Sequence, residues 1–218
     1  MTRADRYESM ISAQEALERL RKGNARFVSD VRSHETLSSQ ARRNEVAAGQ
    51  EPFAIILGCS DSRVPAEIVF DQGLGDLFVI RVAGNIVASS QVGSVEFAAA
   101  RLGTRLVIVL GHTQCGAILA TLEELQQPTG SQSRHLRSIV DHIRPSVEAL
   151  LATELRSNPE ALVRQAVRAN IRASVDHLRH GSWVLEDLIE KNELLVLGGE
   201  YSLETGIVEF FDGVPEAG

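Results

Sequence analysis

Residues 53–63 read FAIILGCSDSR, a short apolar run that ends in a cysteine and a charged loop. Three further apolar runs follow it along the chain: DLFVIRV (76–82), RLVIVLGH (105–112) and ELLVLGGEY (193–201). Short continuous apolar runs are typical of strands buried on both faces, as in a parallel sheet covered by helices. The pattern therefore predicts a mostly parallel central sheet of four strands.

Helical segments are expected around these runs, at residues 91–102, 114–126, 134–151, 159–180 and 182–191. The alternation of strands with helices is that of βαβ units, which predicts an α/β fold with flanking helices. The segment IVEFF (207–211), joined to the fourth run by a short turn, predicts a C-terminal edge strand. Pro128–Ser131 is expected to form a loop inside one sheet-based domain.

The N-terminal part differs in the spacing of its apolar residues, which follows a helical period. Residues 10–22 place apolar side chains on one helical stripe, with Gly23 and Asn24 as the expected stop signal. Another helix is expected over residues 38–48. The chain is expected to consist of an N-terminal helical arm (1–50) and an α/β domain (51–218), together one structural domain.

Composition limits the kind of protein. A chain of 218 residues with 44% hydrophobic residues is long enough to bury a substantial core. Its net charge of -7 argues against nucleic acid or an anionic membrane as the main partner. No run approaches the ~20 apolar residues of a membrane span, and no export signal is visible at the N-terminus. A cytoplasmic location is the expectation.

The only two cysteines, Cys59 and Cys115, both follow apolar runs, and His112 ends the third run. In an open parallel sheet the strand carboxyl ends meet at the edge where ligands bind. Two thiolates and one imidazole favour zinc over magnesium, calcium or manganese. Three protein ligands leave a tetrahedral ion one open position, as in a catalytic site. A lone cysteine at a strand end is often a buried hydrophobe, but the combined motifs indicate metal binding.

Asp61 and Arg63 lie two and four residues after Cys59. Asp61 can accept a hydrogen bond from a nucleophile in the open position, while Arg63 holds the carboxylate through a bidentate fork. In a competing geometry Asp61 leaves Arg63 and becomes the fourth zinc ligand, which gives a closed, inactive site. Both states are chemically reasonable.

Other polar residues are expected to have no part in this site. The remaining histidines lie in polar or helical surroundings and are predicted to be solvated or structural; they are His34, His135, His142, His177 and His180. The arginines of residues 134–179 are likewise predicted to form a solvated helix face.

The segments GCSDSRVPAEIVFDQGLGDLFVIRVAGN (58–85) and LGHTQCGA (110–117) strongly resemble the β-class carbonic anhydrases. The resemblance runs from about residue 16 to 211 and includes ALERLRKGNARFV (16–28) and GGEYSLETG (198–206). It implies zinc-dependent interconversion of carbon dioxide and bicarbonate. The implied zinc ligands are Cys59, His112 and Cys115, with Asp61 and Arg63 beside them.

The same resemblance implies a substrate pocket. Gln50 matches a glutamine that donates a hydrogen bond to substrate, and Phe78 and Ala83 would line an apolar cleft suited to a nonpolar gas. Simple core packing is the alternative role for Phe78. Phe97 stands where many relatives carry tyrosine, so the hydroxyl of that tyrosine is absent from this chain.

Arg81, Val64, Gly58 and Tyr201 resemble a bicarbonate-binding regulatory pocket found in some members. Those members carry a tryptophan three residues before the first cysteine, where this chain has Ile56. The family also implies a homodimer, often doubled to a homotetramer, with the helical arm on the partner and the cleft at the subunit interface.

Three functions remain open from the sequence. The leading interpretation is hydration of carbon dioxide at zinc. The same site on this fold also resembles that of carbon disulfide or carbonyl sulfide hydrolases, which act on related linear electrophiles. The third is a non-catalytic zinc or bicarbonate-binding protein, although a purely structural site would not require Asp61 and Arg63.

Overall fold

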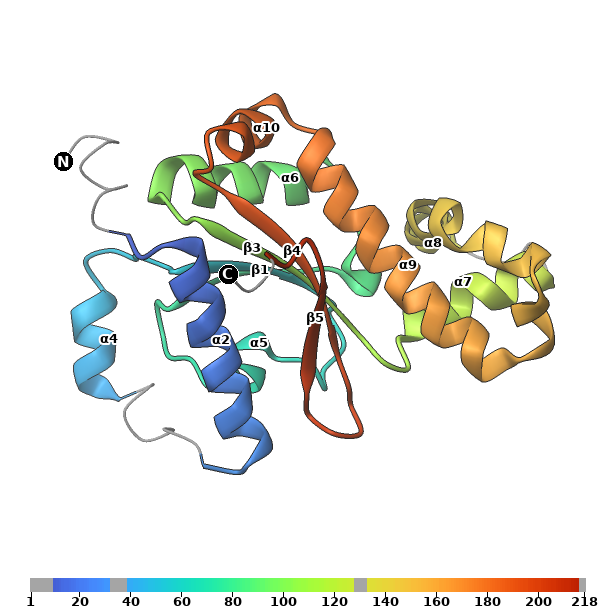
Figure 1. Ribbon diagram of the computed structural model, residues 1–218, viewed down its shortest axis with the longest axis horizontal. Coiled ribbons are helices and arrows are strands. Elements are labelled where there is room, and N and C mark those ends of the chain that lie inside the picture. Colours follow the sequence, from blue (N-terminus) through green and yellow to red (C-terminus); the bar gives the residue numbers. More distant parts are fainter. Residues whose placement is uncertain (1–9, 32–38, 128–132, 216–218) are drawn as a thin grey trace.

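The computed structural model describes residues 10–31, 39–127 and 133–215, and its centre is a five-stranded sheet (Figure 1). The strands are β1 (Ala54–Gly58), β2 (Leu77–Arg81), β3 (Leu106–His112), β4 (Leu195–Tyr201) and β5 (Val208–Asp212). Their order is β2-β1-β3-β4-β5; the first four are parallel, and β5 runs antiparallel to β4. The predicted α/β fold with a C-terminal edge strand is confirmed.

Helices follow most of the strands. They are α2 (Ala13–Val28), α4 (Gln40–Val46), α5 (Ala66–Val69), α6 (Ser89–Glu96), α7 (Gly116–Gln126), α8 (Arg134–Val147), α9 (Pro159–His180) and α10 (Trp183–Glu190). A π-helical segment, Phe97–Leu102, continues α6, and short 3-10 segments lie at Ala83–Asn85, Glu148–Ala152 and Glu154–Ser157. The expected loop at Pro128–Ser131 falls outside the described residues. Among the helices that the structure describes, none is long and apolar enough to cross a membrane.

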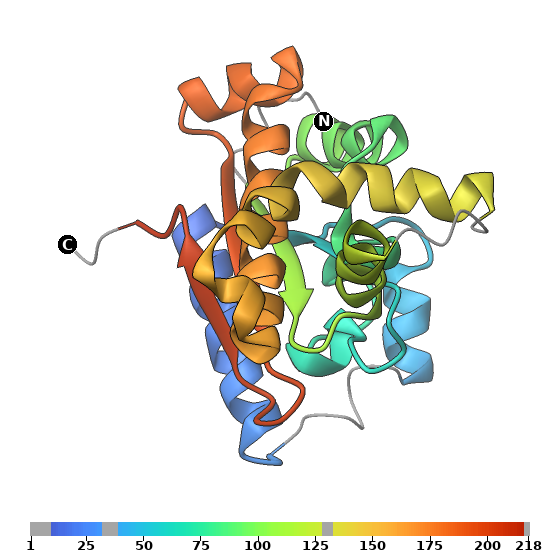
Figure 2. The same ribbon diagram turned by 90° about the vertical axis from the view of Figure 1, so that its right-hand side faces the viewer.

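The sheet separates two hydrophobic clusters. Alternate residues of β1, such as Ile55 and Ile56, enter opposite clusters, as the two-residue period of a strand requires. One cluster joins the sheet to α6 and α7–α10, and the other joins it to α2 and α5. Figures 1 and 2 show α2 well apart from α7 and α8. Burial on both faces explains why β1, β3 and β4 are continuous apolar runs, whereas β2, at the edge of the sheet, is half-buried.

The α9 arginines are only partly the solvated face that the sequence predicts. Arg168 donates to Glu200 at 2.9 Å, and its guanidinium carbon lies 4.3 Å from the centroid of the Phe211 ring. Arg179 donates to the Val196 carbonyl at 2.6 Å and pairs with Asp212 at 2.9 Å. The prediction was wrong for these two residues because β4 and β5 place carboxylates and carbonyls against α9. The four histidines in question that the structure describes are exposed, as expected.

The predicted stop of the first helix at Gly23 and Asn24 was also wrong. Helix α2 continues through both residues to Val28, and both are buried in the middle of it. A Cβ on Gly23 would lie 1.8 Å from the Phe70 carbonyl oxygen, so glycine permits close docking of α2. The Asn24 amide donates to the carbonyls of Val69 and Gly206 and accepts from Val208 N–H. These two residues dock α2 on α5 and on the start of β5 of its own chain.

This docking yields a stability prediction. Gly23→Ala should lower the free energy of unfolding by about 1–3 kcal/mol or more, because the new methyl group meets backbone that cannot move aside freely. Thermal denaturation followed by circular dichroism measures the effect. Gly93→Ala in α6 is the matched control, since its Cβ would meet no atom within 4 Å. Equal melting temperatures for the two variants would contradict the close-docking role of Gly23.

Candidate metal centre

Three buried side chains meet at the carboxyl edge of the two central strands. Cys59 directly follows β1, His112 is the last residue of β3, and Cys115 caps the N-terminus of α7. Their ligand atoms all lie within 4.8 Å of one another. The strand order shows why they meet: β1 and β3 are neighbours, and β2 lies on the outer side of β1. The connection after β1 therefore leads to one side of the sheet, and the connection after β3 leads to the other side. α/β proteins bind ligands between two such connections.

The two thiols influence each other's ionisation. A hydrogen bond from Cys115 is the main cause that lowers the pKa of Cys59, and the Gly84 N–H also donates to the Cys59 sulfur at 3.4 Å. The pKa of Cys115 is raised, first by the same thiol pairing and then by burial. One thiolate therefore forms readily, whereas the second requires a nearby positive charge. A divalent cation bound between the two sulfurs would supply that charge.

His112 is arranged as a ligand. Its Nδ1 lies 2.8 Å from the Thr113 carbonyl oxygen, which can only accept a hydrogen bond, so the proton is assigned to Nδ1. The other ring nitrogen, Nε2, is buried and has no hydrogen-bond partner among the described residues. A free imidazole lone pair beside two thiols is a donor set that suits zinc.

Asp61 is held by Arg63 in a bidentate pair. Arg63 Nε and Nη2 donate to the two carboxylate oxygens at 2.9 and 2.8 Å, and the Arg63 backbone N–H adds a third bond. These bonds, the side-chain ones foremost, keep the pKa of Asp61 far below its usual range. The oxygen bonded to Nη2 lies 3.9 Å from His112 Nε2. Asp61 is thus an ionised acceptor at the edge of the cluster.

Arg81 fixes the loop that carries Cys59 and Asp61. Its Nε donates to the Cys59 carbonyl at 2.9 Å and its Nη2 to the Asp61 carbonyl at 2.6 Å. Arg63 also reaches the carbonyl of Gln114, a residue in the left-handed backbone region with φ of 56°. The two loops around the cluster are therefore tied together by arginine-to-carbonyl hydrogen bonds.

The other regulatory-site candidates lie around this loop. Gly58 ends β1 opposite Arg81 in the register, while Val64 and Tyr201 are buried in the cluster on the α2 side of the sheet. Two donor groups of Arg81 already bond to protein carbonyls. Any anion at this position would share Arg81 with the loop that it supports.

The expected substrate-pocket residues are spread over the sheet. Phe78 is half-buried in β2 and packs against the large core cluster, with its ring centroid 6.2 Å from that of Phe97. Phe97 is 49% exposed. Ala83 begins the short helical turn whose next residue, Gly84, donates to Cys59. Phe78 therefore takes part in core packing, and an apolar edge extends from it to the exposed Phe97.

Gln50 is not brought to the cluster within one chain. It is exposed, lies four residues before β1, and lines a surface pocket with residues of α4 and Gly75. Cys59 follows the opposite end of β1. Five residues of strand span roughly 16 Å at about 3.3 Å per residue, so the two side chains lie at opposite edges of the sheet.

Sequence reasoning missed three groups that support the cluster: the Gly84 N–H, the Thr113 carbonyl and the guanidinium of Arg81 as a brace for the loop. Two of them are backbone groups, which any residue type supplies. The positions next to the motifs were the available signal, because Thr113 directly follows His112 and Gly84 lies in the RVAGN segment.

Comparisons with known proteins agree with this geometry. A family model described as carbonic anhydrase matches residues 54–208. Carbonic anhydrase 2 of Mycobacterium tuberculosis is 37% identical over 199 residues, covering 91% of this chain and 93% of that protein. The carbonic anhydrase of Mycolicibacterium smegmatis is 37% identical over 193 residues, covering 87% and 89%. The structure of the β-carbonic anhydrase CafA of Aspergillus fumigatus has a TM-score of 0.70 at 25% identity, covering 93% of this chain and 91% of that chain. The chain belongs to the carbonic anhydrase family, in its β class.

Proposed function

We propose that the protein catalyses the zinc-dependent, reversible hydration of carbon dioxide to bicarbonate and a proton. The observation that carries the proposal is the buried Cys59, His112 and Cys115 cluster with the ionised Asp61 carboxylate at its edge. Membership of the carbonic anhydrase family indicates the class of reaction, and the three donor atoms indicate which metal would bind. Two thiols and an unpartnered imidazole nitrogen fit zinc better than a hard cation.

Zinc bound by these three residues would supply Lewis acidity, which makes water a nucleophile near neutral pH. The protein's own groups determine how that water is used. Asp61 remains ionised because Arg63 donates to both of its oxygens. It therefore acts as a fixed hydrogen-bond acceptor that orients the water, and it does not act as an acid.

Arg63 has the complementary task. Its bidentate pair with Asp61 keeps the carboxylate at 3.9 Å from His112 Nε2 and prevents it from becoming a ligand. If the hydrogen bonds between Arg63 and Asp61 broke, the carboxylate could rotate toward the cluster and occupy the fourth ligand position, which would close the site. We propose that the pairing of Asp61 and Arg63 describes the active state.

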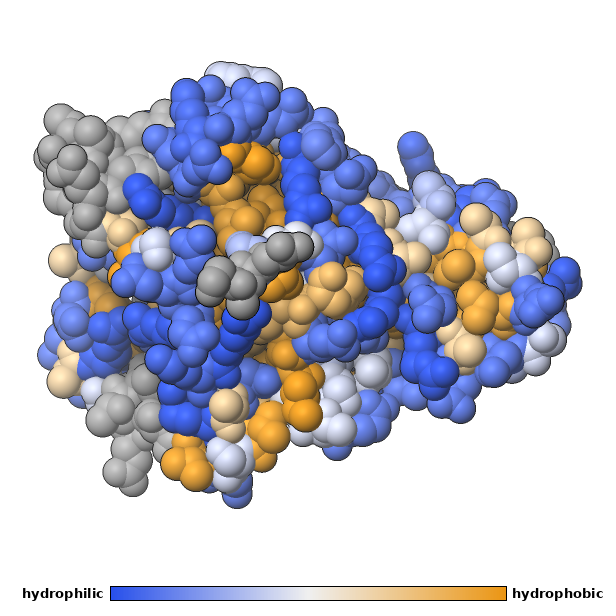
Figure 3. All heavy atoms as spheres, viewed as in Figure 1, coloured by the Kyte–Doolittle hydropathy of each residue, from blue (hydrophilic) through white to orange (hydrophobic). Residues whose placement is uncertain are grey.

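We further propose that the active form is a homodimer or a larger assembly. Gln50 is at the opposite edge of the sheet from its own chain's cluster, so it would reach substrate only at the cluster of a second copy. Apolar surface is visible on the face that carries α2 and β5 (Figure 3), and Val28, Val31 and Ile207 are exposed by 42%, 65% and 51%. An assembly would give such residues a partner.

The central test measures metal and activity on one sample. We expect one zinc per chain and carbon dioxide hydration in the purified protein, and loss of both in Cys115→Ala, which removes one of three ligands. Metal analysis and stopped-flow hydration assays give the two values. Parallel assays with carbon disulfide and carbonyl sulfide test the alternative substrates. A zinc-loaded protein that hydrolyses one of these gases but does not hydrate carbon dioxide would refute the proposed reaction.

Asp61→Asn separates catalysis from metal binding. Asparagine cannot pair with Arg63 as a carboxylate does, so we expect activity to fall by about 100-fold or more while zinc content stays the same. Asp187→Asn, at an exposed ion pair on α10, is the matched control and should retain activity. Full activity in Asp61→Asn would show that the carboxylate has no catalytic role.

Gln50→Ala tests the shared site. We expect reduced carbon dioxide hydration, because the variant lacks the side chain that would reach substrate at the cluster of a second copy. Zinc content should be unchanged, because residue 50 is far from the cluster of its own chain. Sedimentation velocity at micromolar concentration should show a dimer or a multiple of it. A fully active monomer would contradict the shared-site arrangement.

A further inference from the structure

The turn between β4 and β5, residues 202–207, is bonded to the residue that follows the histidine of the cluster. The Thr113 hydroxyl donates to Glu204 Oε2 at 2.8 Å, and the Leu203 N–H donates to that same hydroxyl oxygen at 3.0 Å. The Thr113 N–H donates to the Tyr201 carbonyl at 3.0 Å. Thr113 is therefore held by both its backbone and its side chain.

Thr113 in turn determines where the His112 ring points. Its carbonyl oxygen is the partner of His112 Nδ1 at 2.8 Å, and Nε2 is left free to face the two cysteines. A displacement of the Thr113 peptide would rotate this carbonyl and turn the ring with it. Groups that hold a ligating histidine through its second nitrogen commonly affect metal affinity.

Glu204 is well suited to hold Thr113. A carboxylate only accepts hydrogen bonds, so it directs the hydroxyl proton toward itself and leaves an oxygen lone pair for Leu203 N–H. Ser202 also donates to the same carboxylate oxygen, at 3.1 Å. The hydrogen bond from Thr113 is the main cause that lowers the pKa of Glu204, so the acceptor is ionised at neutral pH.

The turn itself is firmly anchored. The Thr205 and Gly206 N–H groups both donate to Ser202, to its side chain and its carbonyl respectively. From α2, Asn24 donates to the Gly206 carbonyl at 2.8 Å and accepts from Val208 N–H at 2.9 Å. Glu204 thus projects from a braced turn, and its position is set by α2 as well as by the sheet.

We propose that Thr113 and Glu204 are positioning residues that hold the His112 ring through the Thr113 carbonyl and slow the release of zinc. The inference rests on the proposed zinc site. It assigns the exposed Glu204 a role at a metal that it does not touch.

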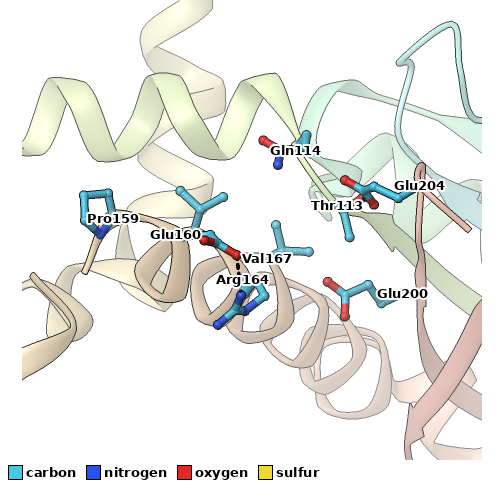
Figure 4. Close-up of a pocket in the computed structure, with 9 residues that line it drawn as sticks. Thr113, Gln114, Pro159, Glu160, Arg164, Val167, Glu200 and Glu204 are labelled. Carbon is cyan, nitrogen blue, oxygen red and sulfur yellow. Dashed lines mark hydrogen bonds and ion pairs between the residues drawn. The ribbon is translucent and has the colours of Figure 1, made fainter.

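The surface pocket that Thr113 and Glu204 line provides a residue for a matched control. Thr113, Glu204 and Glu160 line one pocket of about 480 Å³, with Glu160 coming from α9 across from the other two (Figure 4). Glu160 pairs with Arg164 at 2.7 Å in the same helix. Removing Glu160 takes a similar negative charge from this pocket and leaves the Thr113 bonds in place.

The test measures zinc release from the loaded protein into a colorimetric chelator. Relative to wild type, we expect release about tenfold faster for Thr113→Val and about threefold faster for Glu204→Ala, at or below the low end for partners of a ligating histidine. Glu204→Gln keeps an acceptor oxygen and should release zinc at nearly the wild-type rate, as should Glu160→Ala. In cobalt-substituted protein, the visible d–d bands should shift for Thr113→Val and Glu204→Ala only.

Two results would overturn the inference: Glu204→Ala releasing zinc no faster than Glu160→Ala, or Glu204→Gln behaving like Glu204→Ala. The first would remove the link between the turn and the metal. The second would assign the effect to charge and not to the hydrogen bond. A wild-type protein that binds no zinc would instead refute the proposed function, so the two failures are distinguishable.

Discussion

The parallel pairing of β1 with β3 is the contact on which the rest of the site depends. Leu57 lies opposite Val109 and Gly58 opposite Leu110, so the residues that follow, Cys59 and His112, emerge together at one edge. β2 pairs with the other side of β1, so the connections after β1 and after β3 run away from each other at this edge. Their divergence leaves a space between them. The buried strands β1 and β3 bring Cys59 and His112 together, and Cys115 joins them from the N-terminus of α7.

The strands could be predicted closely because burial on both faces leaves a plain mark in the sequence. Each apolar run contains the strand that it predicts, within one or two residues at either end. Gly23 and Asn24 misled the helix prediction because their roles depend on distant parts of the chain. Glycine avoids the Phe70 carbonyl, and asparagine bonds to the backbone of Val69, Gly206 and Val208. Local propensity contains neither fact.

The same distinction separates the predictable and unpredictable parts of the site. The side chains of cysteine, histidine and aspartate can themselves bind a metal or accept hydrogen bonds. Cys59, His112, Cys115 and Asp61 could therefore be identified from the sequence alone. The Gly84 N–H and the Thr113 carbonyl could not, since every peptide offers such groups. Arg81 was noted as a possible anion ligand, yet its donors are bonded to the carbonyls of Cys59 and Asp61. Only the folded loop defines those partners.

The separation of Cys59 and His112 along the chain has a consequence for folding. An ion bound to both residues would join two points separated by roughly fifty residues, a segment that contains β2 and α6, and would act as a reversible cross-link. Such an ion would bind the folded chain more tightly than the unfolded chain, because the pairing of β1 with β3 brings its ligands together. Loss of such an ion would therefore lower the free energy of unfolding and make separation of the two central strands easier.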